Sequence, residues 1–460
     1  MRPLLSKSTY VYGLQCHKRF YLNKFHKDFA NPEDEQTQAI FQRGTDVGEL
    51  AQKLFPGGVN AQGDEEWHSE ITAKRTTELL PDHDIIYEAA FIYNEVICAV
   101  DILIRKGNQY YAFEVKSTNI LKEQHIEDAA LQYYVLSNCG ISIADFSIVH
   151  FNRDYVKIGD LDVNQLFKAV SVLEEVEAKQ AYIGKNIAVL KKLLKLKEIP
   201  EIEMGKQCDK PYPCNFSEYC LSLIPPSLEV KPELDPTIHI DRDAWKEFAE
   251  GFQYPLYFFD FETVMYGVPE FDFSRPYQQI PFQYSLHWQD AISVPGSPLG
   301  HTEYLGYGVT DPRPDLIKQL IQDLGNTGSI VTWNISFEKG VLKKLAIDFP
   351  EYEVELNSII NRLVDLMPPF RPNRIVYSEA FGGSYSIKNV LPVIVPELSY
   401  GDLNIQEGGT ASFQYGQMQF LEPDAREQLR KDLLEYCHLD TLAMVRIWER
   451  VNEFNYFENI

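Results

Sequence analysis

Residues 85–118 have the sequence IIYEAAFIYNEVICAVDILIRKGNQYYAFEVKST, from which the architecture of the first half of the chain follows. The runs 85–106 and 109–118 are rich in β-branched and aromatic residues, which favour strands. Gly107 and Asn108 between the two runs are turn-forming residues. We therefore expect a β-hairpin, because two β-rich runs separated by two turn residues are typical of that motif.

Three charged residues of this hairpin are expected on one face. Strand side chains alternate between faces, so Glu114 and Lys116 point the same way, and the hairpin brings Asp101 beside them. The residues around them are apolar, namely Val100, Ile102, Phe113 and Val115. The opposite face is therefore expected to be buried, which distinguishes the charged face from an ordinary solvent surface.

Two carboxylates and an ammonium group on one face suit the cleavage of a phosphodiester. Carboxylates hold a divalent cation that polarises the phosphate and activates water, while Lys116 can orient the water or neutralise developing charge. Two carboxylates about 4 Å apart, at an effective dielectric constant of about 20, repel by ~4 kcal/mol, so without a cation they separate or take up a proton. Glu49 is a further candidate ligand from a preceding helix. The alternative is a cross-strand Glu–Lys pair on the surface, since D…ExK is a short pattern.

Helices and one further strand are expected around the hairpin. The first helix begins after Ser6 or Ser8, either of which can cap it, and continues to about Phe25. The other expected elements are helices at 38–54, 128–140 and 163–197 and a strand at 145–152.

The chain is too long for a single hydrophobic core, because such cores stop growing at roughly 250 to 300 residues and this chain has 460. Its 45% hydrophobic and 24% charged residues are the balance of a globular protein. The segment 221–243 is rich in proline and has no clear periodicity, which is typical of a linker. We therefore expect a domain at 1–225, a linker at 226–243 and a second domain at 244–460.

Composition and charge also limit the location and the partners. The start of the chain has no continuous apolar region, and no uncharged apolar run approaches the ~18 to 20 residues that cross a bilayer. We expect a cytoplasmic protein with no membrane partner. The net charge of −24, from 43 basic and 67 acidic residues, repels nucleic-acid phosphates on average, so any nucleic-acid binding must be local. The basic run KKLLKLK at 191–197 fits a solvated helix face or, alternatively, a phosphate contact.

The cysteines favour metal ligation or burial over disulfides. There are seven, an odd number that is sparse for so long a chain. Cys208, Cys214 and Cys220 lie at intervals of six in CDKPYPCNFSEYC. A tetrahedral site usually needs four ligands, so these three thiols leave one position to be filled.

A second set of acids lies in the second half. Asp260 and Glu262 occupy alternate positions of the apolar strand in YPLYFFDFET, so both point to one face. Two buried acids with no cation beside them in the sequence would be costly, which favours metal binding. Glu338 begins a helix after the strand GSIVTWN, and Asp440 follows Tyr436 by one helical turn. Strands and helices alternate in this half, so we expect an α/β fold.

Three other residues near these acids are candidates for a role in the site, and two of them have an alternative structural interpretation. Asp365 is an auxiliary carboxylate or a capping residue. Trp333 stacks on a terminal nucleotide or belongs to the core, and Asn334 beside it is a candidate for hydrogen bonding to that nucleotide.

The hairpin acids resemble the PD-(D/E)XK nuclease core of the RecB type. The resemblance rests on Asp101, on Glu114 and Lys116 in FEVK, on the upstream Glu49 and on the following helix, which carries Asp128 and Gln132. In that family a Gln-x-x-x-Tyr pattern on this helix contacts DNA or supports the site. Gln132 matches the pattern here, but position 136 is Leu, with Tyr133 and Tyr134 nearby.

The distribution of cysteines resembles that of the iron–sulfur RecB-type nucleases, such as the AddB nuclease domain and the CRISPR-associated RecB-like adaptation nuclease. In these proteins one early and three late cysteines join the two ends of the domain around a 4Fe-4S cluster. The resemblance implies that Cys16 is the fourth ligand beside Cys208, Cys214 and Cys220. Zinc is the alternative, although structural zinc sites usually have closer cysteine pairs than the five-residue gaps found here.

The second set of acids resembles the DnaQ-type exonucleases of the RNase H-like group, whose four acids hold two metal ions. The resemblance implies that Asp260, Glu262, Glu338 and Asp440 are the metal ligands and that Tyr436 orients the attacking water. Two departures are present. The second motif usually ends in Phe-Asp, where this chain has Phe337-Glu338, and His438 offers a histidine base as an alternative to the tyrosine.

The two resemblances together cover most of the chain and are similar to a bacterial family of uncharacterised proteins in which both nucleases are fused. They imply an α/β chain with a PD-(D/E)XK restriction-endonuclease-like core, helical flanks and a cluster in its first half, and an RNase H-like mixed sheet in its second. We expect a Mg²⁺- or Mn²⁺-dependent DNA exonuclease with two active sites, acting on single strands or duplex ends in repair or defence. The alternatives are RNA processing and a nucleic-acid-binding scaffold with only one active site.

Overall fold

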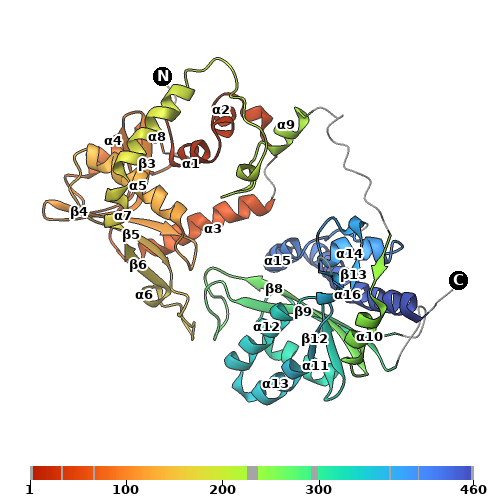
Figure 1. Cartoon of the computed structure of the whole chain (residues 1–460). Coiled ribbons are helices and arrows are strands. Elements are labelled where there is room, and N and C mark those ends of the chain that lie inside the picture. The colour runs from red at the N-terminus through yellow and green to blue at the C-terminus, as the bar shows by residue number, and fades with distance from the viewer. Residues whose placement is uncertain are drawn as a thin grey trace. The chain divides into compact units, whose positions relative to one another are not determined.

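The computed structural model describes residues 4–32, 35–65, 68–224, 237–291, 299–371, 374–401 and 403–456 (Figure 1). They form two compact units. The first comprises Met1–Val230 and Gly267–Tyr277, and the second comprises Lys231–Tyr266 and Gln278–Ile460. The chain leaves the first unit in the segment predicted as a linker, of which residues 226–236 lie outside the described residues, and it returns to that unit for Gly267–Tyr277. Each unit contains its own mixed sheet with helices, which confirms the expected α/β class.

The first unit is built on a six-stranded sheet with the order β1-β2-β3-β4-β5-β6. Strands β2, β3 and β4 form an antiparallel meander, β5 runs parallel to β4, and β6 pairs antiparallel with β5. The short β1 is parallel to β2. The strands are β1 (Val59–Asn60), β2 (Ile85–Tyr93), β3 (Val96–Lys106), β4 (Gln109–Lys116), β5 (Ile143–Phe151) and β6 (Phe167–Ser171).

Helix α5 is the central helix of this unit. It packs against β2, β3 and β5 through a continuous apolar core that includes Ala129, Val135 and Phe146. The helices are α1 (Lys7–Gln15), α2 (His17–Phe25), α3 (Glu35–Gln52), α4 (Glu70–Leu79), α5 (Glu123–Asn138), α6 (Val163–Leu166), α7 (Leu173–Ala178), α8 (Gln180–Leu193) and α9 (Ser217–Ser222). Short 3₁₀ helices lie at η1 (Lys27–Phe29) and η2 (Lys206–Cys208).

The hairpin turn at Gly107 and Asn108 is confirmed, since Lys106 pairs with Gln109 across it. The run 85–106 is not one strand, however, but two strands joined at Asn94 and Glu95. Both residues have positive φ, 51° and 62°, as a two-residue hairpin turn of this kind requires. Glutamate rarely adopts that conformation, so the residue types at these two positions do not predict the turn.

Two predicted helices are divided in the structure. The opening helix begins after Ser6, whose hydroxyl caps it as expected, but it breaks at Cys16, where the backbone is extended. The predicted helix at 163–197 is wrong in its first part, because Phe167–Ser171 forms the edge strand β6. Only Phe167 of that strand is buried, so alternation could not reveal it, and its pairing with β5 decides its conformation.

The second unit contains a five-stranded sheet with the order β10-β9-β8-β11-β12. Strands β8, β9 and β10 are antiparallel, while β11 and β12 run parallel to β8. A separate pair, β7 and β13, is antiparallel. The strands are β7 (His239–Ile240), β8 (Leu256–Met265), β9 (Gln279–Gln289), β10 (Gly300–Leu305), β11 (Ser329–Thr332), β12 (Leu363–Asp365) and β13 (Val376–Tyr377).

Helices cover the second sheet, and α16 packs against β8, β9 and β10. Phe259 and Phe261 of β8 belong to an apolar core shared with α11, α12 and α13. Asp260, which lies between them on the strand, therefore faces the other way. The helices are α10 (Arg242–Glu250), α11 (Arg313–Leu324), α12 (Ile335–Asp348), α13 (Glu353–Asn361), α14 (Ile387–Ile394), α15 (Gly408–Gln417) and α16 (Pro423–Tyr456). The 3₁₀ helices are η4 (Pro350–Tyr352), η5 (Pro368–Phe370), η6 (Glu379–Phe381) and η7 (Met418–Phe420).

Within the described ranges, no helix combines the length and the apolar composition that crossing a bilayer requires.

Candidate functional site

The hairpin of the first unit brings Asp101, Glu114 and Lys116 together. Lys116 Nζ lies 2.8 Å from Glu114 Oε1. Asp101 Oδ2 accepts a hydrogen bond of 2.5 Å from the backbone N–H of Val115. Glu114 is 1% exposed, so this face is not an exposed cross-strand pair but a buried charged cluster.

Helix α5 supplies two more members of this cluster. Gln132 Nε2 donates to Glu114 Oε2 at 2.7 Å, and Asp128 Oδ2 lies 2.6 Å from Lys116 Nζ. Leu136, at the position where the related nucleases have tyrosine, is fully buried in the core. Tyr133 donates instead to Glu177, at 2.9 Å. The helix therefore contributes its glutamine and its aspartate to the charged cluster.

Lys7 was not identified from the sequence, although it contacts the cluster directly. It is the first residue of α1, and its Nζ lies 2.5 Å from Glu114 Oε1, so two ammonium groups share one carboxylate oxygen. Lys7 and Glu114 are 107 positions apart, and no local motif around Lys7 marks it. The packing of α1 against α5, together with the bridge between Leu5 and Val96 of β3, brings the two groups together.

The charges of this cluster shift the pKa values of its acids in opposite directions. Burial alone would raise the pKa of Glu114, but the ammonium groups of Lys116 and Lys7 outweigh burial and hold it well below its usual range. Burial raises the pKa of Asp101, and the nearby carboxylates of Glu114 and Glu88 raise it further. The cluster therefore holds one firmly ionised acid beside one that favours a proton or a cation.

Glu49 does not join this cluster. It is exposed on α3, and among the described residues no hydrogen bond or ion pair connects it with Asp101 or Glu114. The carboxylate that acts on Asp101 from outside the hairpin is Glu88 of β2, which lies 3.3 Å from His68 Nε2. Glu88 has a positive φ of 52°. The pairing of β2 with β3 goes from Tyr87 directly to Ala89, so Glu88 has no paired residue in that ladder.

The four cysteines Cys16, Cys208, Cys214 and Cys220 line one small cavity of the first unit. Cys16 lies at the break between α1 and α2, and the other three lie on and between η2 and α9. The two parts of the chain also contact each other without a metal. The side chain of Gln15 donates to the carbonyls of Gln207 and Tyr212, both at 2.7 Å, and Arg19 donates to Asn215 at 3.1 Å.

The second unit brings together the four acids of the other predicted site. Oxygens of Asp260, Glu262 and Asp440 lie within 4.8 Å of one another. Asp260 also shares a hydrogen bond with the carboxyl group of Glu338, which requires a proton on one of the two. Glu338 Oε2 is buried and accepts no hydrogen bond among the described residues. The acids come from β8, from the first turn of α12 and from α16.

Burial raises the pKa of every acid in this group, and repulsion from neighbouring carboxylates of the group raises those of Asp260 and Glu262 further. Burial raises the pKa of Glu262 to about 8, with a further contribution from Asp440. Burial likewise raises the pKa of Glu338 to about 8 and that of Asp440 to about 6, and it raises the pKa of Asp260 well above its usual value. A group of oxygen donors that resists ionisation in the absence of a cation fits a divalent metal ion.

Tyr436 lies at this carboxylate group, as the sequence suggested, and it is joined by two residues that the sequence did not identify. Tyr436 hydrogen-bonds to Asp440, and Tyr400 donates to Asp440 Oδ1 at 2.7 Å. Lys388 Nζ lies 5.5 Å from the ring centre of Tyr436 and 5.6 Å from that of Tyr400, and its charge counteracts the raised pKa of Glu262. Neither Lys388 nor Tyr400 belongs to a motif that a single sequence reveals.

The start of α15 also approaches the carboxylates. A Cβ added to Gly408, the first residue of that helix, would lie 3.5 Å from Glu262 Oε2 and 4.0 Å from the Tyr436 hydroxyl. The absence of a side chain there keeps the space beside Glu262 open.

The structure also shows the surroundings of the three neighbouring candidates, Asp365, Trp333 and Asn334. Asp365 accepts from the backbone N–H of Met367 at 3.0 Å and of Ile335, as a capping residue does, although its charge also raises the pKa of Glu338. Trp333 is 8% exposed and donates to the carbonyl of Tyr385 at 3.1 Å, so it is a core residue. Asn334 is exposed at the start of α12.

His438 does not contact the carboxylates through any hydrogen bond of the described residues. Its Nδ1 lies 3.2 Å from Nε2 of His301, and its ring also approaches His287. Burial lowers the pKa of His287 to about 2 and that of His301 to about 4, and the neighbouring imidazoles contribute to both shifts. These rings are therefore neutral near pH 7.

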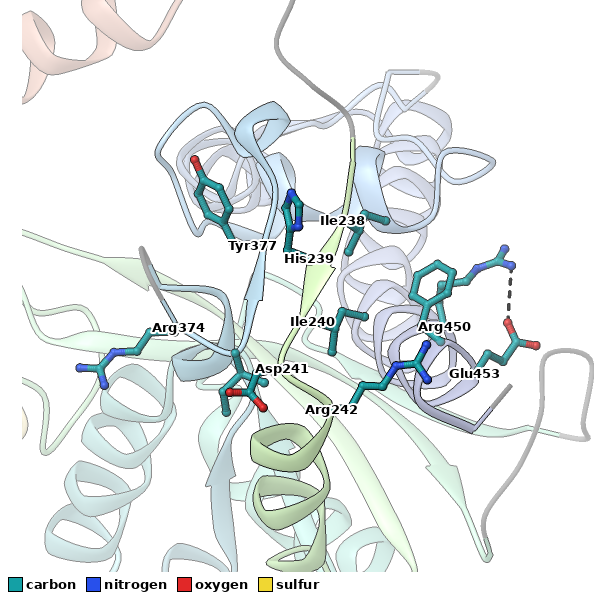
Figure 2. A pocket seen from close by; sticks show the side chains of 11 residues that line it. Ile238, His239, Ile240, Asp241, Arg242, Arg374, Tyr377, Arg450 and Glu453 are labelled. Carbon is teal, nitrogen blue, oxygen red and sulfur yellow. Dashed lines mark hydrogen bonds and ion pairs between the residues drawn. The ribbon is translucent and has the colours of Figure 1, made fainter. Parts of the chain in front are cut away.

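A cavity of about 1070 Å³ lies elsewhere in the second unit. Figure 2 shows it between β7, the start of α10 and the end of α16, with Arg450 and Glu453 paired at 3.5 Å. Two further arginines, Arg242 and Arg374, line it. None of the acids, cysteines or tyrosines predicted from the sequence is among its lining residues, so it is distinct from the carboxylate group.

Comparison with known proteins gives relatives for the middle of the chain. Residues 257–386 match the family model "Domain of unknown function (DUF2779)", a segment that includes Asp260, Glu262 and Glu338 but ends before Tyr436 and Asp440.

Curated relatives cover part of the chain. It is 30% identical over 230 residues to "Uncharacterized protein MG366 homolog" of Mycoplasma pneumoniae, and the aligned part covers 46% of this chain and 34% of that protein. It is 29% identical over 208 residues to "Uncharacterized protein MG366" of Mycoplasma genitalium, 41% of this chain and 31% of that protein. "Uncharacterized protein UU173" of Ureaplasma parvum is 28% identical over 212 residues, 41% of this chain and 30% of that protein. The chain thus spans about a third of the length of these relatives. It contains a DUF2779 domain and has distant relatives among uncharacterised mycoplasmal proteins.

Proposed function

We propose that this chain is a metal-dependent DNA exonuclease with two nuclease sites, one in each unit. The observation that supports it most is the group of four buried acids from three separate elements in the second unit. Burying several like charges costs free energy unless a cation neutralises them. A chain that keeps two of these acids in the middle of an apolar strand gains a metal site by doing so.

Asp260, Glu262, Glu338 and Asp440 would hold Mg²⁺ or Mn²⁺ in the second unit, because both ions prefer oxygen donors. The unpaired Oε2 of Glu338 is an available ligand atom. When bound, such ions polarise the phosphodiester and lower the pKa of water. The strand order β10-β9-β8-β11-β12, three antiparallel strands followed by two parallel ones, is in keeping with an RNase H-like sheet.

The protein's own groups would position water and substrate. Burial raises the pKa of Tyr436, and the neighbouring carboxylates add to this, so its hydroxyl stays protonated near pH 7. It can therefore orient a water molecule by hydrogen bonding but cannot act as the base. Lys388 offers positive charge to a phosphate, and the positive end of the α15 dipole favours anions.

In the first unit, Asp101 and Glu114 would hold the cation and Lys116 would contact the phosphate or the attacking water. The meander β2-β3-β4 followed by α5 and the parallel strand β5 is in keeping with a PD-(D/E)XK core. Lys7 already neutralises Glu114, so a cation entering this site would compete with its ammonium group. Gln132 fixes the other oxygen of that carboxylate.

The cysteine cavity fits a 4Fe-4S cluster better than a zinc ion. Zn–S bonds of about 2.3 Å hold the four sulfurs of a tetrahedral site about 3.8 Å apart. Among the described residues, two groups have potential ligand atoms within 4.8 Å of one another: three histidines and three acids. No three of the described cysteines have sulfurs that close together. A wider spacing suits a cubane, and Lys18 and Arg19 beside the cavity favour an anionic cluster.

The test of this proposal is the digestion of end-labelled single-stranded DNA by the purified full chain. We expect digestion with Mg²⁺ or Mn²⁺ and none in EDTA. Asp260→Ala should lower the digestion of the 3′ end at least about 100-fold, because a lost metal ligand costs several kcal/mol of transition-state stabilisation. Asp424→Ala is the matched control, since Asp424 is exposed on the same helix as Asp440. Equal 3′ digestion by Asp260→Ala and Asp424→Ala would contradict the assignment.

The first site is tested separately by Lys116→Ala. Lys74→Ala is the control, because Lys74 is an exposed lysine of the same unit. Its products should differ from those of Asp260→Ala on 5′-labelled and 3′-labelled strands. Matched RNA strands belong in the same assay, because the carboxylate chemistry does not distinguish the sugars. Faster cleavage of RNA than of DNA would favour RNA processing. Binding in EDTA without any metal-dependent cleavage would favour a scaffold.

A further inference from the structure

Three histidines converge in the second unit on a place that the carboxylate group does not use. His287 of β9 pairs directly with His301 of β10, and His438 of α16 lies against both. The ring centres are 4.4 Å apart for His287 and His301, 4.6 Å for His287 and His438, and 4.4 Å for His301 and His438. His287 is 2% exposed and the other two are half-buried.

The spacing of their nitrogens matches a metal site. One nitrogen from each ring lies within 4.8 Å of the other two. A tetrahedral ion with bonds of about 2.0–2.1 Å to nitrogen holds its ligand atoms about 3.3 Å apart. His438 Nδ1 and His301 Nε2 are 3.2 Å apart, as in a hydrogen bond between the two rings, and this separation also matches that of two ligands of one ion, which would displace the shared proton.

Hydroxyl groups around the histidines can orient the rings. His287 Nδ1 and Thr441 Oγ1 are 2.8 Å apart, which leaves Nε2 of that ring for a ligand. Thr441 Oγ1 is in turn 2.7 Å from Ser285 Oγ, and Ser285 Oγ is 3.1 Å from His301 Nε2. Thr441 is thus a partner on the second nitrogen of His287, and such a partner fixes the orientation and tautomer of a ligating histidine, whereas Ser285 contacts the ligand nitrogen of His301 and would give way to the ion.

The site is separate from the carboxylate group although α16 contributes to both. His438 and Asp440 are two positions apart, and such residues point about 200° apart around a helix. His438 therefore faces β9 and β10, while Asp440 faces Asp260 and Glu262 of β8. Glu303 Oε2 lies 3.8 Å from His301 Nε2 and is a candidate for a fourth ligand.

We propose that His287, His301 and His438 form a binding site for a divalent transition-metal ion of the Zn²⁺ class. Three neutral imidazoles suit Zn²⁺, Co²⁺ or Ni²⁺, whereas Mg²⁺ and Mn²⁺ prefer the oxygen donors of the carboxylate group. An ion bound there would tie α16 to β9 and β10 and so fix the helix that carries Asp440 and Tyr436. The proposal does not depend on nuclease activity.

The test is a titration of the chelator-treated full chain with Co²⁺, whose visible absorption reports its ligands. Wild-type protein should bind one equivalent of Co²⁺ more than His301→Asn. Compared with wild type, His301→Asn should show weaker visible d–d absorption of bound Co²⁺. The near-ultraviolet thiolate band that cysteine ligands produce should be the same in both proteins. His239→Asn is the matched control, because His239 is an exposed histidine of the same unit outside the cluster, and it should behave like wild type. An unchanged stoichiometry and spectrum in His301→Asn would overturn the proposal.

A second measurement covers the case in which His301→Asn fails to fold, which circular dichroism in chelator would reveal. Crystals of the wild-type chain soaked in Zn²⁺ should give an anomalous difference peak bounded by the three rings. The lack of a peak at that position, with zinc present elsewhere in the same crystal, would equally overturn it.

Discussion

Lys7 places a second ammonium group on Glu114, a carboxylate that already pairs with Lys116 at 2.8 Å. Glu114 is almost fully buried, so its charge depends on these two cations and on Gln132 for compensation. Removing one partner from a buried carboxylate leaves part of its desolvation cost uncompensated. Lys7 is therefore expected to matter for stability, and a metal ion can take its place.

Lys7→Ala should destabilise the metal-free protein by about 1–3 kcal/mol near pH 7, less than a fully buried pair because Lys7 is partly exposed and Lys116 remains. Mn²⁺ should restore part of the loss by neutralising Glu114. Urea unfolding in EDTA and in Mn²⁺ measures both effects. Lys27→Ala is the control, since Lys27 is exposed on η1. If Lys7→Ala and Lys27→Ala unfold alike in EDTA, Lys7 has no such role.

The two tyrosines on Asp440 should differ in their effect on catalysis. Burial raises the pKa of Tyr436, and the charges of Asp440 and Glu262 raise it further, whereas Tyr400 donates directly to Asp440 Oδ1 at 2.7 Å. We expect Tyr436→Phe to lower kcat for 3′ digestion about 10- to 100-fold with little change in KM, the range for a group that positions water. Tyr400→Phe should act mainly on metal affinity. Steady-state rates over a Mn²⁺ series separate the two, and identical profiles would refute the distinction.

At the scale of elements, the break between α1 and α2 has a clear consequence. Cys16 has an extended backbone (φ −158°, ψ 121°), so its Sγ reaches the same cavity as the three cysteines of η2, α9 and the segment between them. A continuous helix through residue 16 would turn that side chain with the helical period. The break thus connects the start of the unit with its end, and a metal cluster would strengthen this connection by closing a very long loop.

Cys16→Ser should abolish the cluster and loosen the first unit. We expect the anaerobically purified variant to lack the broad absorption near 400 nm that iron–sulfur clusters show, to contain less iron and to unfold at a lower temperature. Cys139→Ser is the control, because Cys139 is a free, exposed cysteine of the same unit outside the cavity. Zinc in place of iron in the wild-type protein would refute the cluster while leaving the four-cysteine site intact.

At the scale of the whole molecule, the metal-free second unit should lose stability as the pH rises. Glu262 and Glu338 have pKa values of about 8 in the folded state, well above the usual value of 4.5, and Asp440 is raised to about 6. The folded state therefore binds more protons than the unfolded state between about pH 4.5 and 8. Stability falls with pH wherever the folded state binds more protons.

We expect the unfolding free energy in EDTA to fall from pH 5 to pH 8. The fall is about 1.4 kcal/mol per pH unit for each acid that is protonated in the folded state and ionised in the unfolded state. Mg²⁺ should reduce this fall, and Glu262→Gln should make it shallower because one titrating acid is gone. Tryptophan fluorescence is a suitable probe, since four of the five tryptophans, Trp245, Trp288, Trp333 and Trp448, belong to the second unit. A flat profile in EDTA would show that these acids are not strained by burial.

Features that depend on neighbouring positions could be predicted from the sequence. The alternation of Asp260 and Glu262 on β8 follows from the period of a strand, and the hairpin at Gly107 and Asn108 follows from its turn residues. Features that depend on pairing were missed. The strand β6 exists because β5 offers it hydrogen bonds, and the turn at Asn94 is formed with a residue that rarely adopts positive φ.

The sequence alone determined the chemistry available to this protein: which positions carry acids, thiols and a lysine, and which face of each strand presents them. The tertiary structure decided which of these groups meet. It added Lys7, Tyr400 and Lys388, excluded Glu49 from the charged cluster and directed His438 to two other histidines. The physical reason is that side-chain direction is set by local backbone geometry, which a single sequence encodes, whereas contact between positions far apart depends on how whole elements pack.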